Sequence, residues 1–491
     1  MTALLTLPIA LPLGAAALSV VVGRWRVAQR VIGLVTLTAL LGTSIALLVL
    51  VDRDGAEATQ AGGWSAPFGI TLVADRLAAV MLVVSMVMLL AVLVYAIGQG
   101  GEERRHVGFH SVYLALTAGV SAAFLTGDLF NLFVSFEVML TSSYVLLTLG
   151  GRRDQVRSGM TYVVISLVAS ALFLTAVAFV YAATGTVNLA DLAVKFTDLP
   201  VGVRQALALL LLVVFGIKAA VFPLFFWLPD SYPTAPTAVT AVFAALLTKV
   251  GFYAIVRTQT VLLPPNDRPQ TLLLAIAGAT MLVGVLGAIA QNDIKRILSF
   301  LIVSGIGYMV MGLGLFTVAG MAGAVFFIIH HVIVMTALFL TGGLVEQRTG
   351  TGHLDRVGGL IRTAPALALA FLVAGLNLAG VPPLPGFVAK FALVDAGIDG
   401  GWWLVVAVSL LVSLLTLFSM TKIWAGAFWG EVEPAVDLQR PVPMAMLAPT
   451  TSLVALSLAL TLFAGPLYGL AERAATDLLD ASTYVQAVLG S

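Results

Sequence analysis

The stretch Leu209–Pro229 reads LLLLVVFGIKAAVFPLFFWLP, and it decides the fold class. Its apolar run is long enough to cross a bilayer, which takes about 20 residues of α-helix. The run carries one lysine, Lys218, and five residues later a proline, Pro223. Because a proline inside a helix removes a hydrogen-bond donor and clashes with the preceding turn, the sequence predicts a broken membrane helix beside a buried charge.

The whole chain has the composition of an all-α polytopic membrane protein. Of its 491 residues, 60% are hydrophobic and 10% are charged, whereas soluble domains carry about 25% charged residues. The first apolar run has no basic segment before it, so we expect an uncleaved span and not a signal peptide. Apolar windows between charged or Pro/Gly-rich breaks predict about fourteen transmembrane helices, at 2–22, 31–51, 76–98, 109–127, 129–149, 160–183, 205–228, 236–258, 271–290, 296–316, 319–344, 363–396, 402–429 and 444–469.

Several classes of function are excluded or disfavoured by missing motifs. The sequence contains no cysteine, which excludes disulfides and Cys-ligated zinc or iron–sulfur centres within the chain. It shows no Walker loop, haem signature or convincing dinucleotide fingerprint. We therefore predict no cofactor, no metal and no nucleic-acid partner.

Basic residues are distributed unevenly between the two sides of the predicted spans. Of the 25 Lys and Arg residues, fifteen follow odd-numbered spans, seven follow even-numbered spans or lie in the C-terminal tail, and three lie inside spans. Since cytoplasmic loops carry the excess of Lys and Arg, this bias predicts that both termini lie on the outer side of the membrane.

A few titratable residues lie inside predicted spans. An ionised side chain at the bilayer centre costs from about 2.5 to more than 10 kcal/mol, so such residues normally face a protein interior or a wet cavity. A buried amine holds its proton while a carboxylate is near and releases it when the carboxylate moves away, which makes such a set a possible switch. The set comprises Glu137, Lys218, Lys249, His330, His331 and Lys390.

Polar residues accompany these groups at helical spacing. Thr141 and Tyr144 follow Glu137 by four and seven positions, and Tyr253 follows Lys249 by four. Such spacing predicts hydrated helix faces turned inward. We add Thr248 to these supporting positions, and a further stripe is formed by Tyr162, Ser166 and Ser170.

Structural roles are the alternative for each of these residues. A single intramembrane Lys or Glu can form an ion pair that fixes helix register, and a neutral histidine can simply hydrogen-bond between helices. Asp128 and Asp293 lie at span ends, where we expect capping or solvation.

A second interrupted helix is predicted within GLNLAGVPPLPGFVAKF, residues 375–391, where Pro382 and Pro383 precede Lys390. Two disrupted spans that each carry a lysine are typical of an inverted-repeat transporter with its path at the midplane. The correspondence is imperfect, because Lys218 precedes its break and Lys390 follows its own.

Three long segments resemble the antiporter-like family, which contains the Mrp-type multisubunit cation/proton antiporters and the proton-pumping membrane subunits of respiratory complex I. They are KAAVFPLFFWLPDSYPTAPTAVTAVFAALLTKVGFYAI (218–255), NDIKRILSFLIVSGIGYM (292–309) and GVPPLPGFVAKF (380–391). Within the family, segment 130–193 and the chain length look most like the D-type subunits of the Mrp branch.

The resemblance implies fourteen helices, two inverted five-helix repeats, broken helices 7 and 12, and a central polar axis. It implies an N-terminal segment 1–108, repeats at 109–258 and 271–430, and a last helix with tail at 431–491. It assigns the essential glutamate to Glu137, the essential lysine to Lys218, the connecting lysine to Lys249, a histidine to His330 or His331, and the terminal base to Lys390.

Two departures separate the chain from complex I relatives. Many of those read PLHxWLPDAH where this chain reads PLFFWLPDSY from Pro223, so both histidines are absent. Some relatives also place a lysine shortly after the histidine of the eleventh helix, where this chain has Val334, Met335 and Thr336. Bound water must then bridge more of the distance.

The resulting hypothesis is a proton-translocating membrane subunit in a bacterial cell membrane. Protons would follow the midplane row, coupled to Na⁺ or another monovalent cation through other membrane subunits of the complex. The alternatives are a pumping subunit of a complex I or hydrogenase-type redox enzyme, and a scaffold whose buried charges only dock neighbouring subunits.

Overall fold

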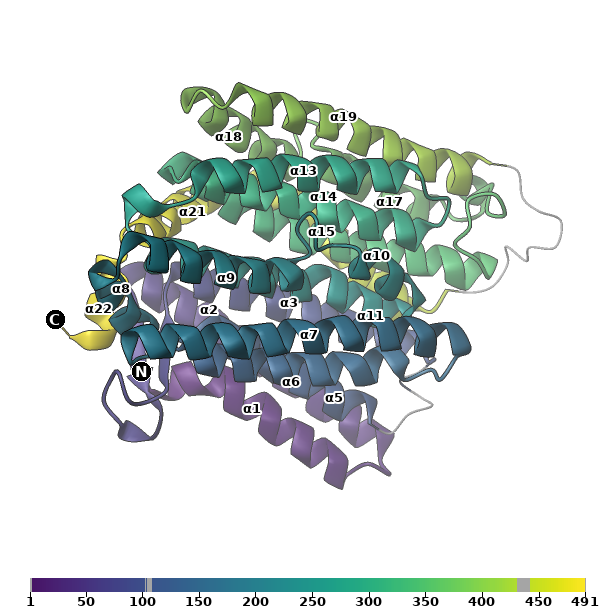
Figure 1. Ribbon diagram of the computed structural model, residues 1–491. Helices are drawn as coiled ribbons and strands as arrows, with labels where there is room; N and C mark the ends of the chain where they lie inside the picture. Colours follow the sequence, from purple (N-terminus) through teal and green to yellow (C-terminus); the bar gives the residue numbers. More distant parts are fainter. Residues whose placement is uncertain (1, 102, 104–107, 431–441, 491) are drawn as a thin grey trace.

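The computed structural model describes residues 2–101, 103, 108–430 and 442–490 and shows a bundle of long, roughly parallel helices (Figure 1). Within these residues, twelve helices are long and apolar enough to cross a membrane, and Phe109–Leu125 and Pro365–Ala379 are shorter apolar helices. The predicted all-α membrane fold is confirmed, whereas the exact count of fourteen spans stays a prediction. Arg104, Arg105 and Arg440, which enter the charge count above, lie outside the described residues.

The chain begins with a three-helix segment that contains a short hairpin. Its elements are α1 (Thr2–Val21), α2 (Arg26–Asp54), β1 (Glu57–Gln60), β2 (Thr71–Ala74) and α3 (Arg76–Gln99). The next group comprises α5 (Phe109–Leu125), α6 (Leu129–Thr148), α7 (Arg153–Thr184), α8 (Leu189–Asp198), α9 (Val201–Ala219), α10 (Trp227–Ser231), α11 (Thr237–Val242), the π-helix η3 (Phe243–Leu247) and α12 (Thr248–Val261).

The second half of the chain continues with another run of helices and ends in a helical tail. Its elements are α13 (Gln270–Ile289), α14 (Ile294–Leu315), α15 (Val318–Thr349), α16 (Leu360–Thr363), α17 (Pro365–Ala379), α18 (Pro385–Asp399), α19 (Trp403–Trp424), the π-helix η5 (Ala425–Trp429), α20 (Met444–Leu462), α21 (Ala464–Leu479) and α22 (Ser482–Leu489).

The innermost helices are mostly apolar and are buried on all sides. α14, α15 and the continuous α11–η3–α12 unit are buried along almost their whole length, whereas α1, α2, α7 and α19 expose most of theirs. α15 contacts helices from both ends of the chain, including α3, α14, α17, α18 and α20. A helix that is hydrophobic all round belongs in a core, and the two inner helices α12 and α15 carry Lys249 and the two histidines.

Two helices are interrupted with the same backbone geometry, 160 residues apart. α9 ends before Ala220, which has φ 60°, and α17 ends before Gly380, which has φ 84°. The next amide, of Val221 or Val381, bonds back at 3.1 Å to the carbonyl five residues earlier in each case. The predicted breaks are therefore present, but both helices end before their prolines Pro223 and Pro382–Pro383 are reached.

The two predicted capping aspartates occupy equivalent places in the two halves. Asp128 caps α6 by accepting from the Asn131 amide at 2.7 Å, and Asp293 caps α14 by accepting from the Arg296 amide at 3.0 Å. Each also pairs in an isolated antiparallel bridge with a residue downstream. The capping interpretation is confirmed.

The structure differs from the sequence prediction at both ends of the chain. The β1–β2 hairpin, in which Glu57 pairs with Ala74, was not predicted. The predicted last span 444–469 is divided, because α20 ends at Leu462 and α21 continues to Leu479. Both termini lie at the same end of the bundle (Figure 1), as an even number of crossings requires.

Candidate functional site

A serine hydroxyl links the carboxylate and the lysine of the first half. Lys218, on the last turn of α9, is 6% exposed, and its Nζ donates to Ser170 Oγ of α7 at 3.3 Å. Ser170 Oγ in turn donates to Glu137 Oε1 of α6. A hydroxyl that accepts from an ammonium and donates to a carboxylate gives a proton a short route between them.

At the first helix break, side chains form hydrogen bonds with backbone groups that the interrupted helix leaves unpaired. The Lys218 ammonium forms its hydrogen bonds elsewhere. Trp227 Nε1 donates to the Ile217 carbonyl at 3.0 Å, and the Phe222 amide donates to Thr280 Oγ1 of α13 at 3.0 Å. The carbonyl end of α9 carries a partial negative charge that would favour the Lys218 ammonium, but no hydrogen bond joins them. The ammonium reaches α7 instead, where it also donates to the Ser166 carbonyl at 3.4 Å.

Lys249 is the second residue after the π-helix η3 and is fully buried. Its Nζ donates to the Ala244 carbonyl, five residues earlier, at 2.7 Å. A π-helix widens the turn and is frequently found at functional sites. Here it supplies a main-chain oxygen to an ammonium in the bundle interior.

The helices that carry Lys218 and Lys249 cross in close contact at a glycine. A β-carbon built on Gly251 of α12 would lie 2.5 Å from the Ala219 nitrogen of α9. Only a residue without a side chain permits this approach. The first two lysines of the predicted row therefore belong to directly packed segments.

His330 and His331 lie at the centre of α15 and are fully buried. The His331 ring stacks on Phe327 with centroids 5.4 Å apart and packs on Gly305 of α14. A methyl group built on Gly386 would lie 3.0 Å from His330 Cε1, which places that ring against the second helix break.

Lys390, on α18, reaches back to the half-helix that precedes the break. Its Nζ donates to the Ala379 carbonyl at the end of α17 and to Ser413 Oγ of α19, both at 3.0 Å. The ammonium also lies 4.9 Å from the centroid of the Tyr308 ring. The carbonyl end of a helix favours a cation, so the end of α17 stabilises the ammonium of Lys390, which lies on the other side of the break.

The predicted supporting residues do not all face this row. Thr141 is exposed, which corrects its assignment to an inward face. The hydroxyl of Tyr253 donates to the Phe124 carbonyl at 2.6 Å, so it belongs to a separate cluster. Tyr144 packs edge-on against Tyr162, and Thr248 is fully buried.

Several buried polar atoms along the row have no hydrogen-bond partner among the described residues. Buried polar groups are otherwise almost always paired with protein or with ordered water. A cavity of about 10 Å³ lies beside Lys218, close to the space one water molecule requires. The unpaired atoms include Tyr144 Oη, Thr248 Oγ1, Ser304 Oγ, Asn377 Nδ2 and all four ring nitrogens of His330 and His331.

Comparisons with known proteins decide the family. The family model described as NADH:quinone oxidoreductase/Mrp antiporter, transmembrane, matches residues 126–416, a range that includes all six titratable residues of the row. The D subunit of the Na⁺/H⁺ antiporter of Alkalihalophilus pseudofirmus is 45% identical over 100% of both chains. The chain belongs to the family of Mrp-type antiporter D subunits. The predicted family resemblance is thereby confirmed.

Solved structures agree with this membership of the Mrp antiporter family. A chain of the Mrp complex from a Dietzia species superposes with a TM-score of 0.94 at 35% identity and covers 100% of both chains. A chain of the archaeal membrane-bound sulfane sulfur reductase superposes with a TM-score of 0.91 at 27% identity over 99% of both chains. The Mrp antiporter fold therefore also occurs in a respiratory membrane complex.

Sequence reasoning missed a buried ion pair in this antiporter-family chain. Arg257, at the end of the predicted span 236–258, was counted with the basic residues that follow even-numbered spans, but it lies inside α12, is 4% exposed and bonds to Asp75 at 2.5 Å. Its Nε also donates to the Tyr253 hydroxyl at 2.9 Å. Lys249, Tyr253 and Arg257 are spaced by four residues on one face of α12, and this spacing was the available signal.

Proposed function

We propose that this chain is the proton-translocating D-type membrane subunit of a multisubunit monovalent cation/proton antiporter. Full-length identity of 45% to the D subunit of a Na⁺/H⁺ antiporter and the match to the Mrp complex support this assignment. The chain acts as a multi-pass transporter subunit, not an enzyme, in a bacterial cell membrane. Its partners are the other membrane subunits of the complex, and its ions are H⁺ and Na⁺.

The Glu137–Ser170–Lys218 link carries the proposal. With Glu137 ionised, the neighbouring ammonium of Lys218 is stabilised, and Ser170 provides a hydroxyl through which a proton can pass. When Glu137 is neutralised, by protonation or by an incoming cation, Lys218 loses that stabilisation and releases its proton toward Lys249. A membrane potential contributes about 2.3 kcal/mol per charge per 100 mV, enough to bias such a transfer.

Beyond Lys218, the proton moves through Lys249 and the histidines to Lys390. The unpaired polar atoms on α12, α14, α15 and α17 support a water-filled connection between these bases. The ammonium of each lysine donates a hydrogen bond to a carbonyl or hydroxyl oxygen. Proton transfer then needs only small movements of flexible side chains.

The coupled cation acts through partner subunits. Glu137 is only half-buried and shares α6 with the exposed Thr141, so its side of the row faces the surface that a neighbouring subunit can cover. A carboxylate from a neighbour, or Na⁺ itself, would change the charge balance at Glu137.

Residues 109–258 and 271–430 form the two inverted repeats of this proposal, flanked by segments 1–108 and 431–491. The two matched breaks and the two capping aspartates support this division. Five crossings in each repeat would place the repeats in opposite orientations. With the excess of basic residues in the cytoplasm, both termini lie outside.

The second candidate function is that of a pumping subunit in a redox complex. The 27% identical match to the archaeal sulfane sulfur reductase favours it. Genes for small antiporter subunits beside this one support the antiporter, and genes for iron–sulfur and flavin subunits support the redox complex.

Two substitutions test the transport function against a purely structural scaffold. Glu137→Ala and Lys218→Ala should abolish Na⁺-dependent proton flux in proteoliposomes, while the complex still assembles. The matched control is Lys422→Ala, because Lys422 donates to the Ile289 carbonyl at 2.9 Å at the end of a span. Flux that survives both site substitutions would support the scaffold.

A further inference from the structure

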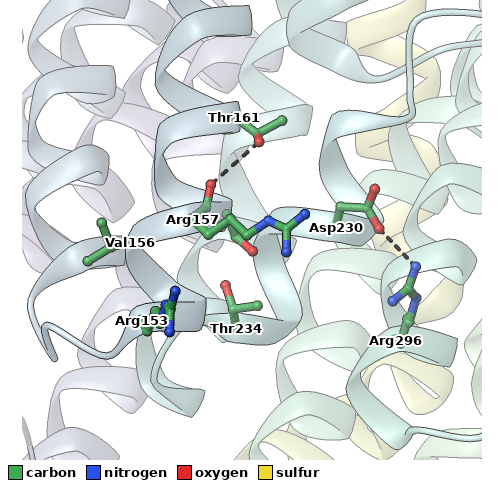
Figure 2. A pocket seen from close by; sticks show the side chains of 8 residues that line it. Arg153, Val156, Arg157, Thr161, Asp230, Thr234 and Arg296 are labelled. Atoms are coloured by element: carbon green, nitrogen blue, oxygen red, sulfur yellow. Dashed lines mark hydrogen bonds and ion pairs between the residues drawn. The ribbon is translucent and has the colours of Figure 1, made fainter.

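A wide groove opens between α7, the segment after the first helix break, and the start of α14. Its volume is about 1540 Å³, and it is lined by Arg153, Val156, Arg157, Ser158, Thr161, Asp230, Thr234 and Arg296. Figure 2 shows the Arg157 side chain extending toward the segment that carries Asp230, whereas the Asp230 carboxylate is directed toward Arg296; Arg153 lies at the edge of the groove. None of these residues belongs to the proton row described above.

The groove carries an excess of positive charge. Arg296 is paired with Asp230 at 2.8 Å, and both side chains are largely exposed. Arg153 and Arg157 are exposed and have no ion-pair partner among the side chains that the structure describes. Two guanidinium groups that no described carboxylate pairs with, next to hydroxyl donors, are suited to a phosphate group, which arginine binds with paired hydrogen bonds.

An apolar stripe begins at the same groove and continues along α7. Val156, Met160, Val164 and Leu167 are 45%, 59%, 54% and 54% exposed. Their spacing places them on one face of the helix, directed away from the bundle. A ligand that uses both features has an anionic head and a long hydrocarbon part.

We propose that this groove binds the phosphate head group of an anionic phospholipid, with an acyl chain along the exposed face of α7. The basic groove and the apolar stripe meet at the first turns of a membrane-spanning helix, where head groups lie. Basic pockets between transmembrane helices on the cytoplasmic side commonly bind such head groups. A free phosphate ion would use the arginines but leave the stripe uncovered.

The head group also holds three parts of the chain together. Arg153 and Arg157 belong to α7, Asp230 to α10, and Arg296 to α14. α10 also carries Trp227, whose indole closes the first break beside Lys218. Occupancy of the groove would therefore stabilise the position of the break without contributing to the proton row itself.

The test compares lipid binding by the intact, delipidated antiporter complex with and without the guanidinium groups of Arg153 and Arg157. Phosphatidylglycerol is titrated, and bound lipid is counted by native mass spectrometry. Because each basic residue near an anionic surface contributes about 1 kcal/mol, the Arg153→Gln/Arg157→Gln variant should bind about 30-fold more weakly, and Arg157→Gln alone about fivefold. The control Arg24→Gln/Arg26→Gln removes two exposed arginines elsewhere and should bind like wild type.

Four outcomes overturn the proposal. The double variant could bind phosphatidylglycerol as wild type does, or phosphatidylcholine could bind equally well to wild type. Inorganic phosphate could protect the complex from thermal unfolding as well as the lipid does, which would make the groove a free-anion site. The double variant could also lose a neighbouring subunit with its lipid count unchanged, which would make the groove a protein contact. Should the double variant fail to assemble, the fivefold effect of Arg157→Gln decides.

Discussion

Ser170→Ala is the sharpest perturbation of the proton row, because it removes one oxygen atom and no charge. The Ser170 hydroxyl accepts from Lys218 Nζ at 3.3 Å and donates to Glu137. Without it, the ammonium and the carboxylate lose the atom that joins them. Both charges remain in place, so a mechanism based on charge alone predicts little change.

The magnitude follows from the two hydrogen bonds. A hydrogen bond to a charged group contributes about 1.5–3 kcal/mol, so loss of one such bond in the transfer step should slow Na⁺-driven proton flux about 10- to 100-fold. Ser170→Thr keeps the hydroxyl and should retain most of the flux. The control is Ser457→Ala, since Ser457 is also buried but donates only to the Val454 carbonyl of its own helix, at 2.7 Å.

The assay uses the complete complex in proteoliposomes that contain a pH-sensitive dye, with flux started by a Na⁺ pulse. Assembly of each variant is checked by native gel electrophoresis. If Ser170→Ala transports within twofold of wild type while remaining assembled, the hydroxyl is not on the proton route and the reasoning is refuted.

Three further substitutions test separate parts of the structure. Lys249→Met should reduce proton flux at least 100-fold in the same assay, whereas Lys422→Met should leave it within a fewfold; equal effects would contradict the row. Gly305→Ala places a methyl group against the imidazole ring of His331 and should destabilise the complex by about 1–3 kcal/mol in thermal unfolding. The control Gly278→Ala, whose new β-carbon would have its nearest neighbour at 4.0 Å, should be nearly neutral. Equal stabilities of the two variants would contradict the close contact between Gly305 and His331. Asp75→Asn leaves its buried arginine partner unpaired and should lower the free energy of unfolding by about 3–5 kcal/mol, and a loss below 1 kcal/mol would show that water compensates that charge.

The sequence was sufficient to predict the membrane class and the two broken helices. Long apolar runs identify spans because a bilayer forces backbone groups into helices, and prolines beside intramembrane lysines identify breaks. The break positions were less accurate. α9 ends at Ala219 because Ala220 adopts a left-handed conformation, and an alanine gives no sequence signal for that.

The titratable residues of the candidate site stand out in the sequence because each is costly in hydrocarbon, but their hydrogen-bond partners were not predicted. Ser170 and Ser413 are ordinary helix residues in the sequence, and only the packing of α7 and α19 brings them to the lysines. Thr141 was misplaced because helical spacing identifies a face without saying which way it points. Arg257 was misplaced because it lies near a predicted span end, where arginines usually mark a loop.

The central claim is that water connects the buried bases into one route. It is tested most directly by a density map of the assembled complex at a resolution that shows ordered water. The account predicts water bound at Thr248 Oγ1 and at the ring nitrogens of His331, linking Lys249 to Lys390. Dry apolar packing between these bases, with no water along that interval, would contradict it.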